Sequence, residues 1–218
     1  MDDERPVVVD RGAGVCGELV LRRAGAHFEI IANGVFLMDT RNGESERRLV
    51  DAAAERMPPG GTLLVGGLGV GFSLRAALDH PRVGDVVVVE REDAVVAWNR
   101  GVLADRHGDA LADHRVRCVG ADLVAWLPSA GESFAAICLD VDNGPEWTVT
   151  DGNAALYDDA GLDLLAAALV PGGVLAVWSA GAAPVFADRL RRRFAAVTVI
   201  EVPVSRGEPD RVFVATRQ

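Results

Sequence analysis

The chain has 218 residues, 50% of them hydrophobic, so it can bury one full-sized core and is expected to form one or two domains. Its formal net charge is −10, and an acidic surface repels phosphates, which argues against DNA or RNA as a partner. The acidity would suit a cationic substrate, although a plain acidic protein is the simpler interpretation.

The N-terminal part is predicted to be β structure. Four short apolar runs follow one another between turn residues, which is the pattern of an antiparallel meander, at residues 7–9, 18–21, 28–31 and 35–38. We therefore expect an N-terminal β segment over residues 1–42.

A helix is predicted over residues 44–57, and strands then alternate with helices. Continuous apolar runs of this kind suit buried parallel strands and occur at residues 63–65, 86–89, 116–119, 135–139, 174–177 and 197–202. Helical patterns lie at residues 72–78, 93–103, 123–127, 158–169 and 184–194, and a final antiparallel strand is predicted at 211–216. The expected fold class is α/β, with a mostly parallel seven-stranded sheet and helices on both faces, over residues 43–218.

The most informative motif is the glycine-rich turn at residues 66–71, between a predicted strand and a predicted helix. Glycine adopts positive φ and lets backbone approach a ligand closely, so a turn of this kind indicates a nucleoside-binding crevice. A plain tight turn and a dinucleotide site are alternatives. A phosphate loop is disfavoured because Phe72 and Ser73 stand where that motif needs Lys and Ser or Thr.

Acidic residues follow the next two predicted strands, where ligands bind in such sheets. Glu90 is placed to accept hydrogen bonds from two ribose hydroxyls, unless it is a plain surface glutamate. Asp122 would accept from the amino group of adenine, and it would also serve as the N-cap of the helix that follows it.

Two carboxylates and an amide, Asp140, Asp142 and Asn143, follow the strand at residues 135–139. Strand side chains repeat every second residue, so Asp140 and Asp142 are expected on the same side of an extended segment. We expect Asp140 to orient or deprotonate a nucleophile such as an amine. The residues from Asn143 onward have good turn chemistry.

In combination these features resemble a class I S-adenosylmethionine-dependent methyltransferase over about residues 62–216. A Pro-Gly-Gly passage at residues 171–173 is typical of the approach to that family's fifth strand. The glycine turn, the Leu74-Arg75 that follows it and the segments 80–83 and 89–90 further resemble the spermidine synthase, or aminopropyltransferase, branch.

The resemblance implies S-adenosylmethionine or its decarboxylated form as the donor, with no metal. The residues expected to bind it are Gly66, Gly67, Leu68, Gly69, Gly71, Glu90, Arg91, Asp122, Leu123 and Asp140, with Asp140 also catalytic. A small-molecule acceptor is expected to contact Glu46, Asp142, Asn143, Trp147 and Tyr157. Trp147 and Tyr157 would equally suit loop packing.

The chain also departs from that branch. Spermidine synthases carry Tyr-His-Glu where this chain has Glu44-Ser45-Glu46, so only Glu46 matches. Their Asp-Ser/Thr-Ser/Thr-Asp signature keeps its first aspartate at Asp140, while the last becomes Asn143. A cationic diamine would thereby lose an anchor carboxylate and an aromatic wall. The resulting prediction is a methyltransferase acting on a small molecule; the alternatives are an aminopropyltransferase using the decarboxylated donor, with polyamine chemistry, and a non-catalytic donor-binding scaffold.

The remaining features bear on location and assembly. Three cysteines without a C-x-x-C pair fit a reducing compartment, and four histidines without ligand spacing predict no zinc site. The acidic residues 1–4 are unlike a signal peptide, and no apolar run approaches the roughly 20 residues that span a bilayer. We expect a cytoplasmic protein without a membrane partner, and apolar edges in the β segment would favour a homodimer.

Overall fold

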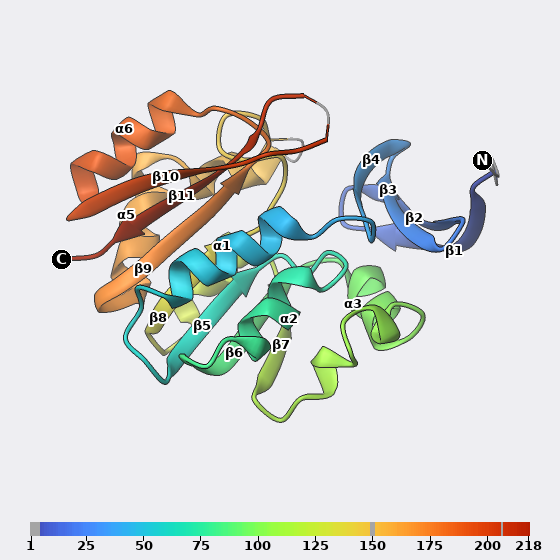
Figure 1. The fold of residues 1–218 in the computed structure, drawn as a ribbon, viewed down its shortest axis with the longest axis horizontal. Coiled ribbons are helices and arrows are strands. Elements are labelled where there is room, and N and C mark those ends of the chain that lie inside the picture. Colours follow the sequence, from blue (N-terminus) through green and yellow to red (C-terminus); the bar gives the residue numbers. More distant parts are fainter. Residues whose placement is uncertain (1–4, 149–150, 206) are drawn as a thin grey trace.

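The first four strands form a small antiparallel sheet to one side of the molecule (Figure 1). The structure is a computed structural model that describes residues 5–148, 151–205 and 207–218, so the acidic residues 1–4 lie outside the described residues. The strands lie side by side in chain order and are β1 (Val7–Gly14), β2 (Gly17–Ala24), β3 (His27–Ala32) and β4 (Val35–Asp39). Leu21 and Ile30 turn into the core from β2 and β3, whereas β1 and β4 are largely exposed.

The second sheet has seven strands in the order β10-β11-β9-β8-β5-β6-β7. Six of these strands run in the same direction, and β11, between β10 and β9, runs in the opposite direction. The strands are β5 (Gly61–Gly66), β6 (Val83–Glu90), β7 (Val116–Gly120), β8 (Phe134–Leu139), β9 (Leu169–Ser179), β10 (Ala196–Val202) and β11 (Asp210–Thr216).

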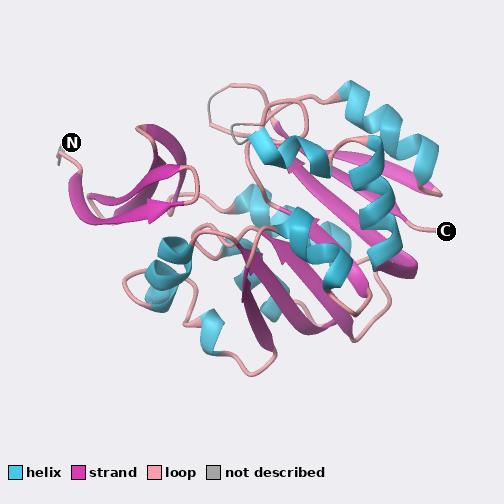
Figure 2. Cartoon of the chain, turned by 180° about the vertical axis from the view of Figure 1, so that it is seen from behind, coloured by secondary structure: helices cyan, strands magenta, loops and turns pink. Residues whose placement is uncertain are grey.

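Helices cover both faces of this sheet (Figures 1 and 2). The first face carries α1 (Glu44–Ala54), α2 (Phe72–Asp79) and α3 (Asp93–Arg100). The opposite face, turned toward the viewer in Figure 2, carries α4 (Leu123–Trp126), α5 (Asp159–Ala168) and α6 (Pro184–Arg193). Short 3₁₀ turns complete the connections at Ala104–Arg106, Ala110–Ala112, Leu127–Ser129 and Asp151–Leu156.

The core lies in two layers because strand side chains alternate between the two faces. In β5, Leu63 and Val65 point into the layer beneath α1 and α2, while Leu64 points into the layer beneath α5. Every residue of β8 is buried, which explains why the central strands are continuous apolar runs.

The small sheet is joined to the large unit close to the glycine turn. The indole Nε1 of Trp98 in α3 donates to Oδ2 of Asp10 in β1 at 2.8 Å. Gly12 approaches Ala94 so closely that an added Cβ would lie 2.6 Å from the Ala94 Cβ. In the same region, the side chain of Met38 from β4 packs against Gly69 of the turn.

The predicted fold class is confirmed: a mostly parallel seven-stranded α/β sheet with helices on both faces follows an antiparallel β segment. Some predicted boundaries are wrong. The helix predicted at residues 158–169 ends at Ala168, and Leu169 already pairs with Phe134, so the Pro-Gly-Gly passage lies inside β9. The helices predicted at 44–57 and 93–103 end at Ala54 and Arg100. No described helix is long and apolar enough to cross a membrane.

One edge of the large sheet gathers the polar strand ends. The parallel strands β5, β6 and β8 finish there, with Glu90 at the end of β6 and Asp140 directly after β8. Because β11 runs the opposite way, its first residue, Asp210, comes to the same edge. The first turn of α1 also lies there, since Ser45 donates a hydrogen bond to Asp210.

Candidate active site

The glycine turn between β5 and α2 requires glycine on steric grounds. Gly67 has φ +90°, and a Cβ there would lie 2.3 Å from the carbonyl oxygen of Asp140. Gly69 has φ +52°, and its Cβ would lie 2.3 Å from Sδ of Met38. Positive φ strains other residues, so the turn holds a shape and a close packing that side chains would prevent.

Glu90 is fixed beneath this turn by backbone donors. Its Oε2 accepts from the amide of Leu68 at 2.9 Å, and its Oε1 accepts from the amide of Glu92 at 2.8 Å. The residue is 9% exposed, and burial raises the pKa of its carboxyl above the usual range. Each carboxylate oxygen can accept a further hydrogen bond, so Glu90 is oriented and still able to bind hydroxyl groups.

Asn99 supports the turn from α3, a role that sequence reasoning missed. Its Nδ2 donates to the carbonyl oxygens of Gly69 at 2.7 Å and of Val95 at 2.9 Å. Asn99 is completely buried. An amide side chain among the apolar residues of a predicted helix could have indicated a buried polar contact. Only the tertiary fold shows that this contact is with the carbonyl of Gly69.

Asp140 follows β8, so it lies between the glycine turn after β5 and the ends of β9 and β11. Its amide donates to the carbonyl of Gly66 at 2.9 Å, and its Oδ2 accepts from the hydroxyl of Ser73 in α2 at 2.9 Å. Burial raises the pKa of Asp140 to about 6, with further upward contributions from Asp210 and Glu90, while the Ser73 hydrogen bond acts downward.

Glu46 and Asp210 share this region with Asp140. Burial, followed by the negative charges of Asp140 and Asp210, raises the pKa of Glu46 to about 8. Oδ2 of Asp210 accepts from Ser45 Oγ at 2.5 Å and from Trp178 Nε1 at 3.2 Å. We call Glu46, Asp140 and Asp210 the carboxylate cluster.

Within the described part of the chain, no residue of the carboxylate cluster forms an ion pair. Neighbouring like charges in a partly buried place are unfavourable unless a proton or a cation relieves them. The described residues also hold no group of three His, Cys, Asp or Glu side chains placed to share a metal ion.

The loop after Asp140 differs from the expected extended segment. Asp142 has φ +64°, in the left-handed region, so the expectation that Asp140 and Asp142 share one side of a strand is wrong. The Asp142 carboxylate instead accepts from Asn153 Nδ2 at 3.1 Å and from the amide of Asn143 at 3.2 Å. The carbonyl of Asn143 accepts from the amide of Ala180 at 3.1 Å, which holds the loop against the end of β9.

The two aromatic candidates have different surroundings. Tyr157 is 1% exposed, donates its hydroxyl to the carbonyl of Val141 at 3.0 Å and packs edge-on against Phe186. The structure thus favours the packing alternative for Tyr157. Trp147 is 65% exposed beyond the loop.

The remaining residues predicted to bind the donor follow β6 and β7, at the same edge of the sheet. Oδ1 of Asp122 accepts from the amide of Ala125 at 3.0 Å, which is the N-cap alternative, and leaves the adenine role as a prediction. Leu123 is buried beside Gly66. Arg91 bonds Glu92 at 3.1 Å and the thiol of Cys16 at 3.2 Å, so it reaches toward the β1–β2 turn.

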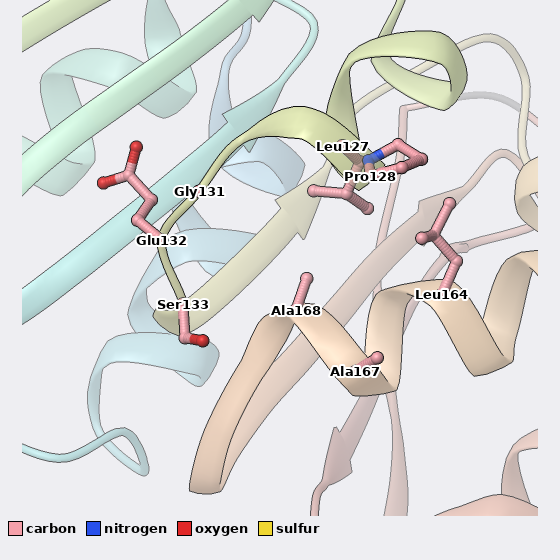
Figure 3. A pocket seen from close by; sticks show the side chains of 8 residues that line it. All are labelled: Leu127, Pro128, Gly131, Glu132, Ser133, Leu164, Ala167 and Ala168. Atoms are coloured by element: carbon pink, nitrogen blue, oxygen red, sulfur yellow. The ribbon is translucent and has the colours of Figure 1, made fainter.

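A separate hollow of about 460 Å³ lies at the other end of the sheet (Figure 3). Figure 3 shows Leu127 and Pro128 on one side of it and Leu164 of α5 on the other. The hollow is lined by Leu127, Pro128, Gly131, Glu132, Ser133, Leu164, Ala167 and Ala168. These residues flank the start of β8, whereas the glycine turn and the carboxylate cluster lie beyond its end, so the hollow is not part of the candidate site.

An open α/β sheet with a glycine turn and acidic residues at its strand ends defines a nucleoside-binding fold of the Rossmann-like class. The family model described as the spermine/spermidine synthase domain matches residues 46–184. The chain therefore belongs to the spermine/spermidine synthase family, as its sequence motifs predicted.

Curated relatives and solved structures agree with this assignment. The polyamine aminopropyltransferase of Mycobacterium tuberculosis is 30% identical over 167 residues, which are 73% of this chain and 30% of that protein. Polyamine aminopropyltransferase 1 of Hyperthermus butylicus is 31% identical over 144 residues, 64% of this chain and 47% of the relative. The chain thus spans less than half the length of these relatives.

Two solved structures show the same fold. Spermidine synthase from Thermotoga maritima superposes with a TM-score of 0.77 at 16% identity, covering 97% of this chain and 72% of the other. A spermidine synthase in complex with the transition state analogue AdoDATO gives a TM-score of 0.78 at 16% identity, covering 97% and 74%.

Proposed function

We propose that the protein is an aminopropyltransferase that moves the aminopropyl group of decarboxylated S-adenosylmethionine onto an amine. The observation that carries the proposal is the position of Asp140, whose main chain bonds the glycine turn while its carboxylate belongs to the carboxylate cluster. A donor bound at the turn and an amine attracted by the cluster would meet at this residue.

The donor half of the proposed site consists of the glycine turn, Glu90 and Asp122. The turn would lie against the tail and sugar of the donor, and the fixed carboxylate of Glu90 would accept from the ribose hydroxyls. The free oxygen of the Asp122 carboxylate would accept from the adenine amino group, while its other oxygen caps α4. Leu123 and Arg91 border the same half and complete the proposed contacts.

The proposed reaction is a direct displacement at carbon. The amine nitrogen forms a bond to the aminopropyl carbon next to sulfur, the carbon–sulfur bond breaks, and its electron pair neutralises the sulfonium, which leaves as methylthioadenosine. Asp140 takes the proton that the nitrogen must lose. A carboxyl with its pKa raised to about 6 is a stronger base than an ordinary aspartate and is still ionised at neutral pH.

The carboxylate cluster also favours the decarboxylated donor over S-adenosylmethionine. The tail of S-adenosylmethionine ends in a carboxylate, which would approach the negative charge of Asp140 and be repelled. The decarboxylated tail ends in an ammonium group, which the same charge attracts. The comparisons with aminopropyltransferases likewise support this alternative better than the methyltransferase prediction.

Product analysis tests the proposal. The purified protein is incubated with 1,4-diaminobutane and either donor, and the nucleoside products are separated. We expect methylthioadenosine and aminopropylated amine in equal amounts, only when both decarboxylated donor and amine are present. Formation of S-adenosylhomocysteine together with a methylated amine, when S-adenosylmethionine is the donor supplied, would restore the methyltransferase prediction, and binding without any product would support the scaffold alternative.

The homodimer remains a prediction, and exposed apolar side chains of the N-terminal sheet support it. Its outer strands expose large apolar side chains, including Val7, Val8, Val35, Phe36 and Leu37. Exposed apolar groups gathered on one small sheet are typical of an interaction surface. Light scattering of the purified chain would measure its mass in solution.

A further inference from the structure

Asp210 lies at the candidate site because β11 runs opposite to the neighbouring strand β9. It is the first residue of β11, and β11 is antiparallel to β9, so Asp210 stands at the edge where the parallel strands finish. Arg211, the next residue, pairs with Ser179 at the end of β9 and directs its guanidinium to Glu201 at 3.2 Å. The neighbouring cation therefore does not neutralise Asp210.

The carboxylate of Asp210 is held in place by only one of its oxygens. Ser45 from α1 and Trp178 from β9 both donate to Oδ2, at 2.5 and 3.2 Å. No described residue donates to Oδ1. Two fixed donors on one oxygen orient the group and leave the second oxygen for a charge-assisted hydrogen bond.

Asp210 lies on the side of Asp140 that faces away from the glycine turn. The strand order runs β11-β9-β8-β5, so β9 separates the strand of Asp210 from the strand that leads to Asp140. Neighbouring strands are about 4.8 Å apart, which places the two strand ends about 10 Å from each other. A molecule whose reacting nitrogen is at Asp140 would extend over β9 toward Asp210.

The same stretch of the edge contains the loop with Asn143. The amide of Ala180, just after β9, bonds the Asn143 carbonyl, and the residue before Ala180 pairs with Arg211. Asn143 is the position where the resemblance to spermidine synthases leads one to expect an aspartate. The carboxylate that is absent at position 143 is thus replaced by one on β11, beyond β9.

We propose that Asp210 is a specificity-determining residue that binds the ammonium group of a diamine acceptor farthest from the reacting nitrogen, with Ser45 as its positioning residue. The inference rests on the proposed function for the identity of the reacting nitrogen. It assigns to β11 the anchoring charge that position 143 lacks.

Calorimetry in the presence of saturating methylthioadenosine tests this proposal independently of turnover. The wild type, Asp210→Asn and Ser45→Ala are titrated with 1,4-diaminobutane and with n-butylamine, which lacks the second ammonium. The matched control is Glu208→Gln, which removes one charge from an exposed side chain two residues away. Titration with methylthioadenosine alone reports whether each variant keeps its fold.

We expect Asp210→Asn to weaken diamine binding about 30-fold, as loss of a charge-assisted hydrogen bond does, and to leave n-butylamine within about 2-fold. Ser45→Ala should weaken the diamine about 3-fold and spare n-butylamine, because the carboxylate remains but is less fixed. Glu208→Gln should match the wild type for both amines.

Equal losses for the two amines, or no loss for the diamine, in Asp210→Asn would overturn the inference. If Asp210→Asn no longer binds methylthioadenosine, the inference is tested with Ser45→Ala instead. Unchanged diamine affinity in Ser45→Ala would then overturn the inference. Failure of the wild type to bind the diamine would do the same. Asp210-dependent diamine binding without aminopropyl transfer would support the inference and contradict the proposed function.

Discussion

The two halves of the candidate site are built by different means. On the donor side, backbone amides of Leu68 and Glu92 hold Glu90, and the glycine turn is contiguous in sequence. On the acceptor side, the carboxylate cluster joins three segments, and side chains donate to the carboxylates of Asp140 and Asp210; Ser45 and Asp210 are 165 residues apart. The donor half is thus a local motif, whereas the acceptor half exists only in the folded chain.

The two halves also differ in how their charge is stabilised. Glu90 receives a backbone hydrogen bond on each oxygen, which compensates part of the cost of its burial. Burial and neighbouring carboxylates raise the pKa of Glu46 and of Asp140, and no member of the carboxylate cluster forms an ion pair with a described residue. The acceptor half is therefore the part whose stability and affinity should respond most to pH and to bound cations.

The largest effect is expected where the halves meet. Asp140→Asn keeps the shape of the side chain but removes the proposed base, so kcat should fall by about 100-fold or more, as is usual for loss of a general base. Methylthioadenosine affinity, measured by calorimetry, should stay within about 3-fold, because this nucleoside lacks the tail that would approach Asp140. Turnover equal to that of the wild type would remove Asp140 from the mechanism.

Gly67→Ala should damage the donor half selectively. The new methyl group would lie 2.3 Å from the Asp140 carbonyl at φ +90°, so the turn must shift. We expect methylthioadenosine affinity to fall about 30-fold, an effect of about 2 kcal/mol, comparable to the cost of strained backbone. The control is Gly152→Ala, where an added Cβ meets nothing within 4 Å, and a loss of similar size there would discredit the steric explanation.

The acceptor half should make stability depend on pH through Glu46. Its pKa is about 8 in the folded protein and is close to 4.5 when exposed, so the folded state holds the proton more tightly than the unfolded state does. Stability from this proton is fully present below about pH 4.5 and is lost as the pH rises through about 8.

Urea unfolding at pH 5 and pH 8 measures this effect. The free energy of unfolding should fall toward pH 8 by up to about 1.4 kcal/mol for each unit of pKa difference, reduced by solvent screening of the partly exposed carboxylate. Glu46→Gln, which cannot ionise, should lose much of this slope. The same slope in wild type and variant would show that Glu46 is ionised in the folded protein at pH 5.

The smallest effect is expected beneath the turn. Asn99→Ala removes the hydrogen bond to the Gly69 carbonyl, so the turn loses support without losing any donor contact. Loss of one such bond corresponds to about 3- to 10-fold weaker methylthioadenosine binding. Amine affinity should not change; if calorimetry found the amine weakened as much as the nucleoside, the separation of the two halves would be wrong.

The sequence predicted the donor half because its signals are local. The strand, the glycine turn and α2 follow one another, and Glu90 ends the next strand, so periodicity places them together at the carboxyl ends of the parallel strands, where ligands bind in such sheets. The fold class follows from the same order of elements, and the family resemblance rests on the glycine turn with Leu74-Arg75 and on segments 80–83 and 89–90. The division at residue 42, the cytoplasmic location and the homodimer stay predictions.

The acceptor half was harder to predict because its contacts depend on long-range packing. Asp210 was overlooked although the last strand was expected to be antiparallel, which alone brings its first residue to the ligand edge. Tyr157 was a candidate for the pocket because it precedes the helix predicted at 158–169, with loop packing as the equal alternative, and the fold buries it in the core. The left-handed conformation of Asp142 broke the two-residue period on which its position was inferred.

The most direct test of the account is donor discrimination by the carboxylate cluster, measured as the calorimetric dissociation constants of S-adenosylmethionine and its decarboxylated form. The two ligands differ only in the carboxylate that would meet this cluster. We expect the decarboxylated donor to bind at least about 10-fold more tightly. In Asp140→Asn, the ratio of the two dissociation constants should be smaller than in the wild type. Equal affinities, or tighter binding of S-adenosylmethionine, would contradict the proposal that the acceptor half selects an aminopropyl donor.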